Sequence, residues 1–576
     1  MNIHALLVNR FTEALEKMGV ENAPIPVSRS ARPEFGEYQF NGAMALAKQL
    51  KQKPRDIAEK IVETVTLSDV ACKLEIAGPG FINIHLDDVW LARQCEQSLN
   101  DPRLGIATSP EQNIVVDYSS PNLAKEMHVG HLRTTIIGDA VVKVLEFLGH
   151  NVIRQNHMGD WGTQFGMLLA HLSDKLQEEV AETALSDLED FYREAKVRFD
   201  EEEGFADRAR EYVVKLQGGD PQCLALWEKF IDVSIAHSEE VYEKLNVSLT
   251  RNDIMGESAY NDDLANVIAD LQAKGIAVED QGAQVVFIPE LADKEGNPAV
   301  YIVQKSGGGY LYATTDLAAM RYRSGKLSAD RTLILTDARQ ALHFKQTEIV
   351  GRKAGFMTQE QTYEHCPFGM MLGKDGKPFK TRTGGTVKLV ELLDEAVERA
   401  GKLIAERDND LSEDELNEVA RKVGIGAVKY ADLSKNRTTD YMFNWDSMLS
   451  FEGNTAPYLQ YAYTRVKSLF RKANVAIETQ PNHITITEKQ EHHLAVLLLQ
   501  FEEVISMVSR EATPHLLCTY LYDVASSFMT FYEACPMLKD GIDLKVRDSR
   551  LALSALVANT LQQGLTLLGI ETLEKM

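Results

Sequence analysis

The sequence predicts an α/β protein in which a doubly wound parallel sheet with an insertion is joined to an N-terminal α+β domain and a C-terminal all-α bundle. Three observations indicate this fold class. The chain has 576 residues, more than one hydrophobic core usually holds, so several domains are expected. Short apolar runs alternate with helical patterns in its central part, as in parallel sheets. Beyond Gly453 the apolar spacing is helical almost throughout.

Residues 1–110 are expected to form the N-terminal α+β domain. Apolar residues recur at helical spacing over residues 6–18 and 54–65. The runs 73–76 and 81–86 have the pattern of short strands, and a Gly-Pro-Gly turn separates them. A Ser-Pro pair then marks a linker, which indicates the end of this domain.

Residues 111–390 are expected to form the doubly wound domain. The apolar run 113–118 predicts a buried parallel strand, residues 129–148 predict a helix, and residues 151–155 predict the next strand. A strand, a helix and a strand in this order form a βαβ unit. Such a unit predicts a parallel sheet that binds its ligands at the carboxyl ends of the strands.

The stretch 171–300 is predicted to be an acidic insertion within this domain. It holds 30 acidic and 12 basic side chains, and so contributes −18 to the formal net charge of −24. The run of four acidic residues from Asp200 is typical of a solvated helix face. Strand patterns at 300–304 and 331–336, with a helix starting near Thr315, indicate that the parallel sheet resumes after the insertion. The rest of the chain is nearly neutral, so the acidic total does not exclude a nucleic-acid partner.

A helical connector is expected over residues 391–450 and a helical bundle over 451–576, in which 493–510 and 550–568 are long amphipathic stretches. The six scattered cysteines form no C-x-x-C pair, which predicts free thiols and no structural metal. No apolar run approaches the roughly 20 residues that span a bilayer, and the N-terminus lacks a signal-peptide pattern. We therefore expect a cytoplasmic protein without membrane contact.

The segment from Asp117 to His131, DYSSPNLAKEMHVGH, holds the residues best suited to chemistry. Two histidines three positions apart at the start of a helix suit a metal site, a structural helix start or a nucleotide site. A metal site lacks further ligands at a convincing spacing. In a nucleotide site, the unpaired N–H groups of the helix start attract phosphates, and Gly130 allows close approach. His128 and His131 then donate hydrogen bonds to the α-phosphate.

The string from Lys125 to Arg133 resembles the extended HIGH signature of class I aminoacyl-tRNA synthetases. Further motifs follow in the expected order along essentially the whole chain, and together they are similar to the bacterial type of the arginyl-tRNA synthetase family. These motifs are Ser120-Pro121-Asn122, the segment from His157 to Gly166, that from Tyr312 to Asp316, that from Asp337 to Gln340, and that from Gly453 to Tyr458.

This resemblance implies a Rossmann-type catalytic domain that activates L-arginine with ATP, assisted by Mg²⁺, and then transfers the arginine to the 3′ end of tRNA(Arg). It also implies that bound tRNA is needed for the activation step. The KMSKS loop of class I enzymes is missing, and the basic segment 373–385 stands in its place. The implied catalytic residues are Lys125, His128, His131, Lys380 and Arg382, and the implied ATP-binding residues are Gly130, His128, His131 and Lys377. Which cation among Lys374, Lys377, Lys380 and Arg382 contributes most stays open.

An arginine substrate presents a planar guanidinium group with five donors, so its pocket needs carboxylate, carbonyl or hydroxyl acceptors. By the resemblance, Asp316 and Tyr312 bind the guanidinium group. Taken alone, Asp316 also suits a helix N-cap. The other polar groups of the substrate are implied to contact Asp117, Ser119, Asn122 and Gln340.

The contacts to tRNA are expected from the two terminal domains. Tyr458, Tyr461 and Arg465 lie on one helical face, and two aromatic rings with a cation suit the stacking of unpaired bases. Such a stripe alone is also typical of core packing. By the resemblance this helix binds the anticodon, with Met576 close by, whereas Phe81 and Asn83 contact the D-loop. A monomer is expected.

Two other functions stay open. One is a different nucleotidyltransferase of the HIGH type, for which the helical tail would be superfluous. The other is a non-catalytic tRNA-binding protein derived from a synthetase, which would not need to keep Lys125, His128, His131 and Asp316.

Overall fold

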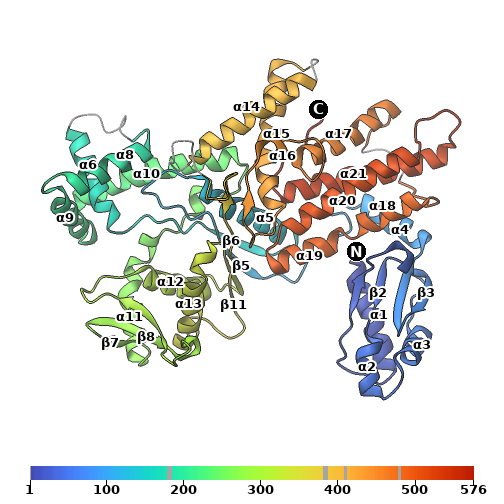
Figure 1. The fold of residues 1–576 in the computed structure, drawn as a ribbon, viewed down its shortest axis with the longest axis horizontal. Helices are drawn as coiled ribbons and strands as arrows, with labels where there is room; N and C mark the ends of the chain where they lie inside the picture. Colours follow the sequence, from blue (N-terminus) through green and yellow to red (C-terminus); the bar gives the residue numbers. More distant parts are fainter. Residues whose placement is uncertain (1, 178–184, 380–386, 408–410, 478–481) are drawn as a thin grey trace.

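The computed structural model describes residues 2–177, 185–379, 387–407, 411–477 and 482–576. Figure 1 shows the central sheet in the middle of the molecule, with the inserted elements on one side of it. The C-terminal helices lie on the other side, and the N-terminal domain lies below them. No helix within the described ranges is long and apolar enough to cross a membrane.

The N-terminal domain is the predicted α+β unit. Its four strands form an antiparallel sheet in the order β1-β2-β4-β3, and the expected strand pair around the Gly-Pro-Gly turn is present as β3 and β4. A further helix, α4, leads from this domain to the C-terminal helices. The elements are α1 (Ile3–Lys17), β1 (Val27–Arg29), β2 (Tyr38–Phe40), α2 (Ala43–Leu50), α3 (Pro54–Thr64), β3 (Ala71–Ala77), β4 (Phe81–Leu86) and α4 (Asp88–Leu99).

The central sheet has four parallel strands in the order β11-β10-β5-β6, so the predicted βαβ unit of β5, α5 and β6 is confirmed. Asp117, Gln155, Ile334 and His365 pair in register at the carboxyl ends of the four strands. This is the sheet edge at which ligands are expected. The elements are β5 (Asn113–Asp117), α5 (Leu132–Phe147), β6 (Asn151–Gln155), β10 (Arg331–Ile334), α13 (Ala341–Ala354) and β11 (Thr362–His365).

One predicted strand belongs to a different sheet. Residues 300–304 do form a strand, but β9 pairs antiparallel with β8 and not with the central sheet. Val300 and Ile302 face outward while Tyr301 and Val303 are buried, so this strand is covered on one face only. A run of apolar residues does not reveal which strand it pairs with. This unit contains α11 (Asn261–Ala273), β7 (Val278–Asp280), β8 (Ala283–Ile288), β9 (Ala299–Gln304) and α12 (Tyr312–Arg321).

The central sheet separates two hydrophobic cores. On β10, Leu333 belongs to the main core, whereas its neighbour Ile334 belongs to a second core. The second core is formed by the β7–β9 unit together with α12, α13 and Tyr363 of β11. The acidic insertion is therefore divided between the two cores, because its helical first half contributes Phe191 and Phe230 to the main core.

The helical first half of the insertion has the solvated acidic face that its composition predicts. The residues from Asp200 to Glu203 are all exposed. The apolar side chains of the same helices pack inward, and the ring of Phe230 contacts those of both Phe165 and Phe191. The helices are α6 (Gln164–Gln177), α8 (Leu188–Glu201), α9 (Phe205–Gln217) and α10 (Pro221–Lys244).

The C-terminal bundle is helical, as predicted, with one difference, whereas the region expected to be a helical connector contains the short strand β13 beside its helices. The stretch 493–510 is two helices, because Gln500 leaves the helical conformation and its side chain reaches the hydroxyl group of Tyr38. A short parallel ladder, β12 with β13, joins the catalytic domain to the connector. The elements are β12 (Met371–Leu372), α14 (Leu389–Arg407), α15 (Glu413–Leu433), β13 (Tyr441–Met442), α16 (Trp445–Met448), α17 (Ala456–Ala473), α18 (Lys489–Leu499), α19 (Phe501–Glu511), α20 (His515–Ala534) and α21 (Leu544–Leu567).

Ion pairs hold the N-terminal domain against the bundle. On α18, His492 contacts Glu37 at 2.9 Å and Asp88 at 2.6 Å. On α19, the buried carboxylate of Glu503 accepts a 2.5 Å hydrogen bond from the hydroxyl group of Tyr38. The two terminal domains are thus in direct contact although they lie about as far apart in sequence as the chain allows.

Candidate active site

The paired histidines lie in a 3₁₀ turn, η2 (Val129–His131), directly before α5. The backbone N–H of Gly130 donates to Nδ1 of His128 at 3.0 Å, and the N–H of His128 donates to Nδ1 of His131 at 3.1 Å. Since each Nδ1 accepts a hydrogen bond, a neutral ring carries its proton on Nε2. Both imidazoles therefore present an Nε2–H donor.

The two rings are neutral near pH 7. Burial, together with the neighbouring His128, lowers the pKa of His131 to about 3. Burial and then the positive charge of Lys125 lower the pKa of His128. The ring centroids are 4.1 Å apart, which places two uncharged donors side by side.

Gly130 is required by the conformation of the turn. A Cβ atom at this position would lie 2.7 Å from Cε1 of His128. Any other residue would displace that ring, so the glycine preserves both the exposed backbone and the orientation of His128.

Lys125 extends from the loop after β5 towards the insertion. Its Nζ lies 4.3 Å from the ring centroid of Tyr192 on α8, in a cation–π contact. The side chain is exposed, so its charge is directed to the surface beside the paired histidines.

The basic segment 373–385, the predicted counterpart of the KMSKS loop, lies partly within the described residues. Lys374 and Lys377 are exposed in a turn that the N–H of Gly373 closes by donating to the carbonyl of Lys377 at 2.7 Å. At the other end, the N–H of Val129 donates to the carbonyl of Val387 at 3.1 Å. Lys380 and Arg382 lie outside the described residues.

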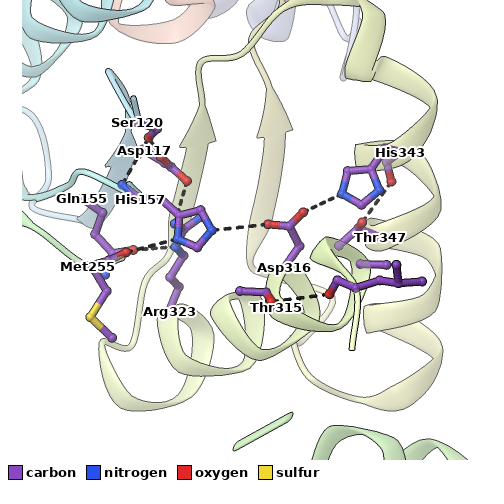
Figure 2. Close-up of polar contacts among 12 residues, drawn as sticks. Asp117, Ser120, Gln155, His157, Met255, Thr315, Asp316, Arg323, His343 and Thr347 are labelled. Carbon is purple, nitrogen blue, oxygen red and sulfur yellow. Dashed lines mark hydrogen bonds and ion pairs between the residues drawn. The ribbon is translucent and has the colours of Figure 1, made fainter. Parts of the chain in front are cut away.

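Figure 2 shows Asp316, the predicted guanidinium ligand, between two histidines from different elements. His343 of α13 donates to its Oδ2 at 2.5 Å, and Nε2 of His157, after β6, lies 3.9 Å from Oδ1. Tyr312, one turn earlier on α12, is exposed, and its ring contacts that of His343 at 4.8 Å. Asp316 is the fifth residue of α12 and not its N-cap, so the helix-cap alternative is wrong.

Glu257 is a functional candidate that the sequence did not reveal. Burial, then the carboxylates of Asp316 and Asp160, raise its pKa to about 7. A pKa that burial and neighbouring charges shift this far marks a candidate functional residue. Glu257 lies in the acidic insertion, and the sequence alone does not distinguish it from the many exposed acidic residues there.

The predicted ligands at the end of β5 are engaged with protein groups. Asp117 forms a buried ion pair with Arg323 at 2.7 Å and accepts from the hydroxyl group of Ser120 at 2.8 Å. The hydroxyl group of Ser119 is buried beside that of Tyr242 on α10, at 2.7 Å. Their contacts with a substrate therefore stay a prediction.

Asn122 and Gln340 are exposed near the same sheet edge. The side-chain oxygen of Asn122 accepts from the N–H of Ala124 at 2.9 Å and from Gln164 at 3.0 Å. Gln340 directly precedes α13, the helix that carries His343. The structure thus brings the predicted arginine ligands to one edge of the sheet.

Family models match the chain in three consecutive parts. The model described as "tRNA synthetases class I (R), catalytic domain" matches residues 94–445, more than half of the chain. The "Arginyl tRNA synthetase N terminal domain" matches residues 5–86, and the "DALR anticodon binding domain" matches residues 459–576. The chain belongs to the arginyl-tRNA synthetase family.

Similar proteins cover the whole length. The chain is 91% identical to the arginine–tRNA ligase of Alteromonas mediterranea and 75% identical to that of Pseudoalteromonas atlantica, with complete coverage of both chains in each case. Among solved structures, the arginyl-tRNA synthetase of Plasmodium falciparum has a TM-score of 0.87 at 29% identity over 100% of this chain and 99% of its own. That of Thermus thermophilus has a TM-score of 0.84 at 25% identity, with both chains fully covered.

In this arginyl-tRNA synthetase family member, the predicted anticodon stripe lies on α17. Tyr461 is 37% exposed, and Arg465 lies 4.9 Å from the ring centroid of Tyr532. Tyr458 is half-buried and its ring contacts that of Tyr522 at 5.6 Å. The stripe is therefore partly core and partly surface.

The remaining tRNA candidates differ in exposure. Met576 packs partly buried against the main core, to which α17 also contributes residues. Phe81 is half-exposed at the start of β4. Asn83, however, is 1% exposed and accepts a 2.7 Å hydrogen bond from Gln39, so a contact with RNA would require this pair to open. The assignment of Asn83 stays a prediction.

The paired histidines make backbone contacts through both of their Nδ1 atoms. No group of three or more His, Cys, Asp or Glu side chains suited to a metal ion is found within the described ranges. The backbone bonds to both Nδ1 atoms already explain the turn in which these histidines lie.

Proposed function

We propose that the protein is an arginine–tRNA ligase that converts L-arginine and ATP to arginyl-adenylate and diphosphate, and then transfers the arginyl group to the 3′ end of tRNA(Arg). One observation carries this proposal. At the carboxyl ends of the parallel strands, two neutral histidine donors follow β5, and the Asp316 carboxylate lies between His157 and His343.

The activation step needs stabilisation of charge that develops on the α-phosphate. The Nε2–H groups of His128 and His131 are fixed by their Nδ1 contacts, so they need no reorganisation when that charge appears. Lys125, Lys374 and Lys377 then act on the diphosphate leaving group, as do Lys380 and Arg382. Mg²⁺ enters with the ATP phosphates. Catalysis in this proposal is positioning and electrostatics, with no covalent enzyme intermediate.

The choice of arginine rests on acceptors for a planar, charged group. Asp316 offers two carboxylate oxygens to the guanidinium group, and the hydroxyl group of Tyr312 adds another acceptor. The raised pKa of Glu257 supports a second carboxyl at the same place. A lysine substrate would present a compact ammonium group that cannot use such a set in a bidentate manner.

The transfer step requires tRNA(Arg) on the terminal domains. The exposed ring of Tyr461 with Arg465 suits an unpaired anticodon base, and the N-terminal domain is held close to this bundle through His492 and Glu503. We expect arginine activation to depend on bound tRNA, and the protein to act as a cytoplasmic monomer.

Exchange of labelled diphosphate into ATP tests this function. The expected result is exchange that requires both arginine and cognate tRNA. No exchange in the presence of tRNA would exclude the ligase. Strong exchange without tRNA would leave the ligase intact but contradict the expected dependence on tRNA. Exchange supported by a different adenylate acceptor, without arginine, would indicate another nucleotidyltransferase.

A further inference from the structure

Arg133 is a buried cation that the steps above do not use. It is the second residue of α5, two positions after His131, and its side chain is 2% exposed. Its Nε lies 3.1 Å from Oδ2 of Asp432 on α15, whose side chain is fully buried. A single residue thus joins α5, the helix that directly follows the paired histidines, to the connector.

The same guanidinium group also contacts the segment that leads into β13. One Nη donates to the backbone carbonyl of Thr439 at 2.9 Å, and the group lies 5.2 Å from the ring centroid of Tyr441. Three contacts of different kinds therefore fix the planar fork, and two of them are to residues 439–441.

Strand β13 in turn holds the strand that precedes the basic turn. The N–H of Tyr441 donates to the carbonyl of Met370 at 3.1 Å, and the N–H of Phe443 donates to the carbonyl of Leu372 at 2.9 Å. Leu372 is followed at once by the turn that contains Lys374 and Lys377. After that turn, Phe379 packs against Phe443 at 4.8 Å between ring centroids.

These contacts form a continuous path from the paired histidines to the basic turn. The path runs from α5 through Arg133 to β13, and from β13 to β12 and the two lysines. Backbone hydrogen bonds join β12 to β13, whereas the step from α5 to β13 in this path is made by the side chain of Arg133.

A buried ion pair is a poor means of holding two helices together. Removing both charges from water costs several kcal/mol per ion, and apolar side chains of similar volume often stabilise as well or better. The arginine instead contributes a defined geometry, because the donors of its planar guanidinium group hold two partners at fixed positions.

We propose that Arg133 is a positioning residue for adenylate formation: it fixes the β12–β13 ladder, and with it Lys374 and Lys377, relative to His128 and His131. This proposal rests on the proposed ligase function. In that reaction the histidines act on the α-phosphate and the lysines act on the leaving diphosphate, so the distance between the two groups determines how well both ends of the breaking P–O bond are stabilised. A displacement of about 1 Å at a reacting centre costs on the order of 100-fold in rate.

The test compares Arg133→Lys with a matched control, Arg550→Lys. Lysine keeps the charge near Asp432 but cannot also reach Thr439 in the fork geometry. Arg550 likewise pairs with a buried carboxylate, Glu491, and donates to a backbone carbonyl, that of Pro536, but it lies in the C-terminal bundle. In each variant, a guanidinium group that binds a buried carboxylate and a backbone carbonyl is therefore replaced by a single ammonium group.

We expect Arg133→Lys to lower the kcat of arginine-dependent ATP–diphosphate exchange by about 30- to 100-fold. The KM for arginine and the affinity for tRNA should stay within about twofold of the wild type, since neither site is displaced. Arg550→Lys should leave kcat within about twofold. A general loss of structure would move all of these quantities together, and the thermal midpoint of each variant records it.

A double variant, Arg133→Met with Asp432→Met, separates the positioning role of the guanidinium group from its contribution to stability. It replaces the ion pair by apolar side chains, so we expect the thermal midpoint to be kept while kcat stays low. Restored kcat in this variant, or a kcat of Arg133→Lys that matches that of Arg550→Lys, would overturn the proposal. If the double variant does not fold, the two lysine variants decide. An inactive wild-type protein would instead refute the ligase function itself.

Discussion

Asp316 is the residue that we propose binds the guanidinium group of the substrate. Its carboxylate lies between His157 and His343, which come from elements far apart in the chain. The spacing of Tyr312 and Asp316 along α12 was visible in the sequence, but the two histidines were not, because only the fold brings them to this carboxylate. The same holds for Arg323, which donates a hydrogen bond to the carboxylate of Asp117 and lies 206 positions after it in the sequence.

Replacing Asp316 by Asn should remove most arginine use. The amide keeps the shape but loses the charge-assisted hydrogen bonds to a guanidinium group, which are worth about 1.5–3 kcal/mol each. We expect kcat/KM for arginine to fall by about 100-fold or more, with tRNA affinity within about twofold. Asp394→Asn, on an exposed part of α14, is the control. An equal loss of tRNA affinity in the Asp316 variant would indicate a structural role.

Glu257 should make arginine binding depend on pH. Burial and the carboxylates of Asp316 and Asp160 raise its pKa to about 7, so in the free protein it is largely protonated at pH 6 and largely ionised at pH 8. A guanidinium cation favours the ionised form. The KM for arginine should therefore fall as the pH rises from 6 to 8, by at most about tenfold per pH unit.

Glu257→Gln is the matched variant, since it cannot ionise in this range. We expect its KM for arginine to be higher at pH 8 and nearly constant with pH. A steep dependence that persists in this variant would assign the titration to another group of the site.

At the scale of elements, local patterns predicted strands and helices well and pairing poorly. The strands β5 and β6, with α5 between them, were predicted almost to the residue, because a parallel strand is a short apolar run and α5 ends before a glycine with positive φ. The strand β9 was predicted but assigned to the wrong sheet, since its partner β8 lies within the insertion. The break at Gln500 was missed because no glycine or proline marks it, and the contact of its side chain with Tyr38 of another domain appears only in the fold.

The face of α17 allows a prediction about tRNA at the same scale. Tyr461→Ala removes an exposed ring without opening the core, so we expect tRNA affinity to fall by the equivalent of about 1–3 kcal/mol, which is roughly 5- to 150-fold. The thermal midpoint should stay unchanged. Leu544→Ala, which removes another exposed apolar side chain from the bundle, is the control for nonspecific surface effects. Equal affinity in the two variants would assign the stripe to packing alone.

At the scale of the whole molecule, the ion pairs of His492 connect the two ends of the chain. Hydrogen bonds to Glu37 and Asp88 raise its pKa to about 9, so the ring is charged at pH 7. Because the folded pKa is above the unfolded value of about 6.5, this contribution is complete below pH 6.5 and is lost as the pH rises through 9.

Raising the pH from 7 to 10 should therefore loosen the N-terminal domain from the bundle. We expect a loss of about 1–2 kcal/mol, after allowance for solvent screening of the partly exposed Asp88. Thermal unfolding as a function of pH measures it. In His492→Gln this loss should already be present at pH 7, and the remaining change with pH should be smaller. An unchanged pH profile in that variant would exclude this histidine as the source.

The residues proposed to bind arginine lie on elements of two hydrophobic cores, and this has a thermodynamic consequence. Asp316 belongs to α12 of the second core, whereas Asp117 and the paired histidines belong to elements of the main core. An arginine molecule that contacts both sides therefore acts as a cross-link between two separately packed units, and its binding energy opposes the local unfolding of the second core. Amide hydrogen exchange should accordingly slow in α12 and α13 when arginine is added, and remain unchanged in α1 and α3. The exchange protection of α12 and α13 would then report how much of the protein has arginine bound, because these helices contain none of the residues proposed to contact ATP or tRNA.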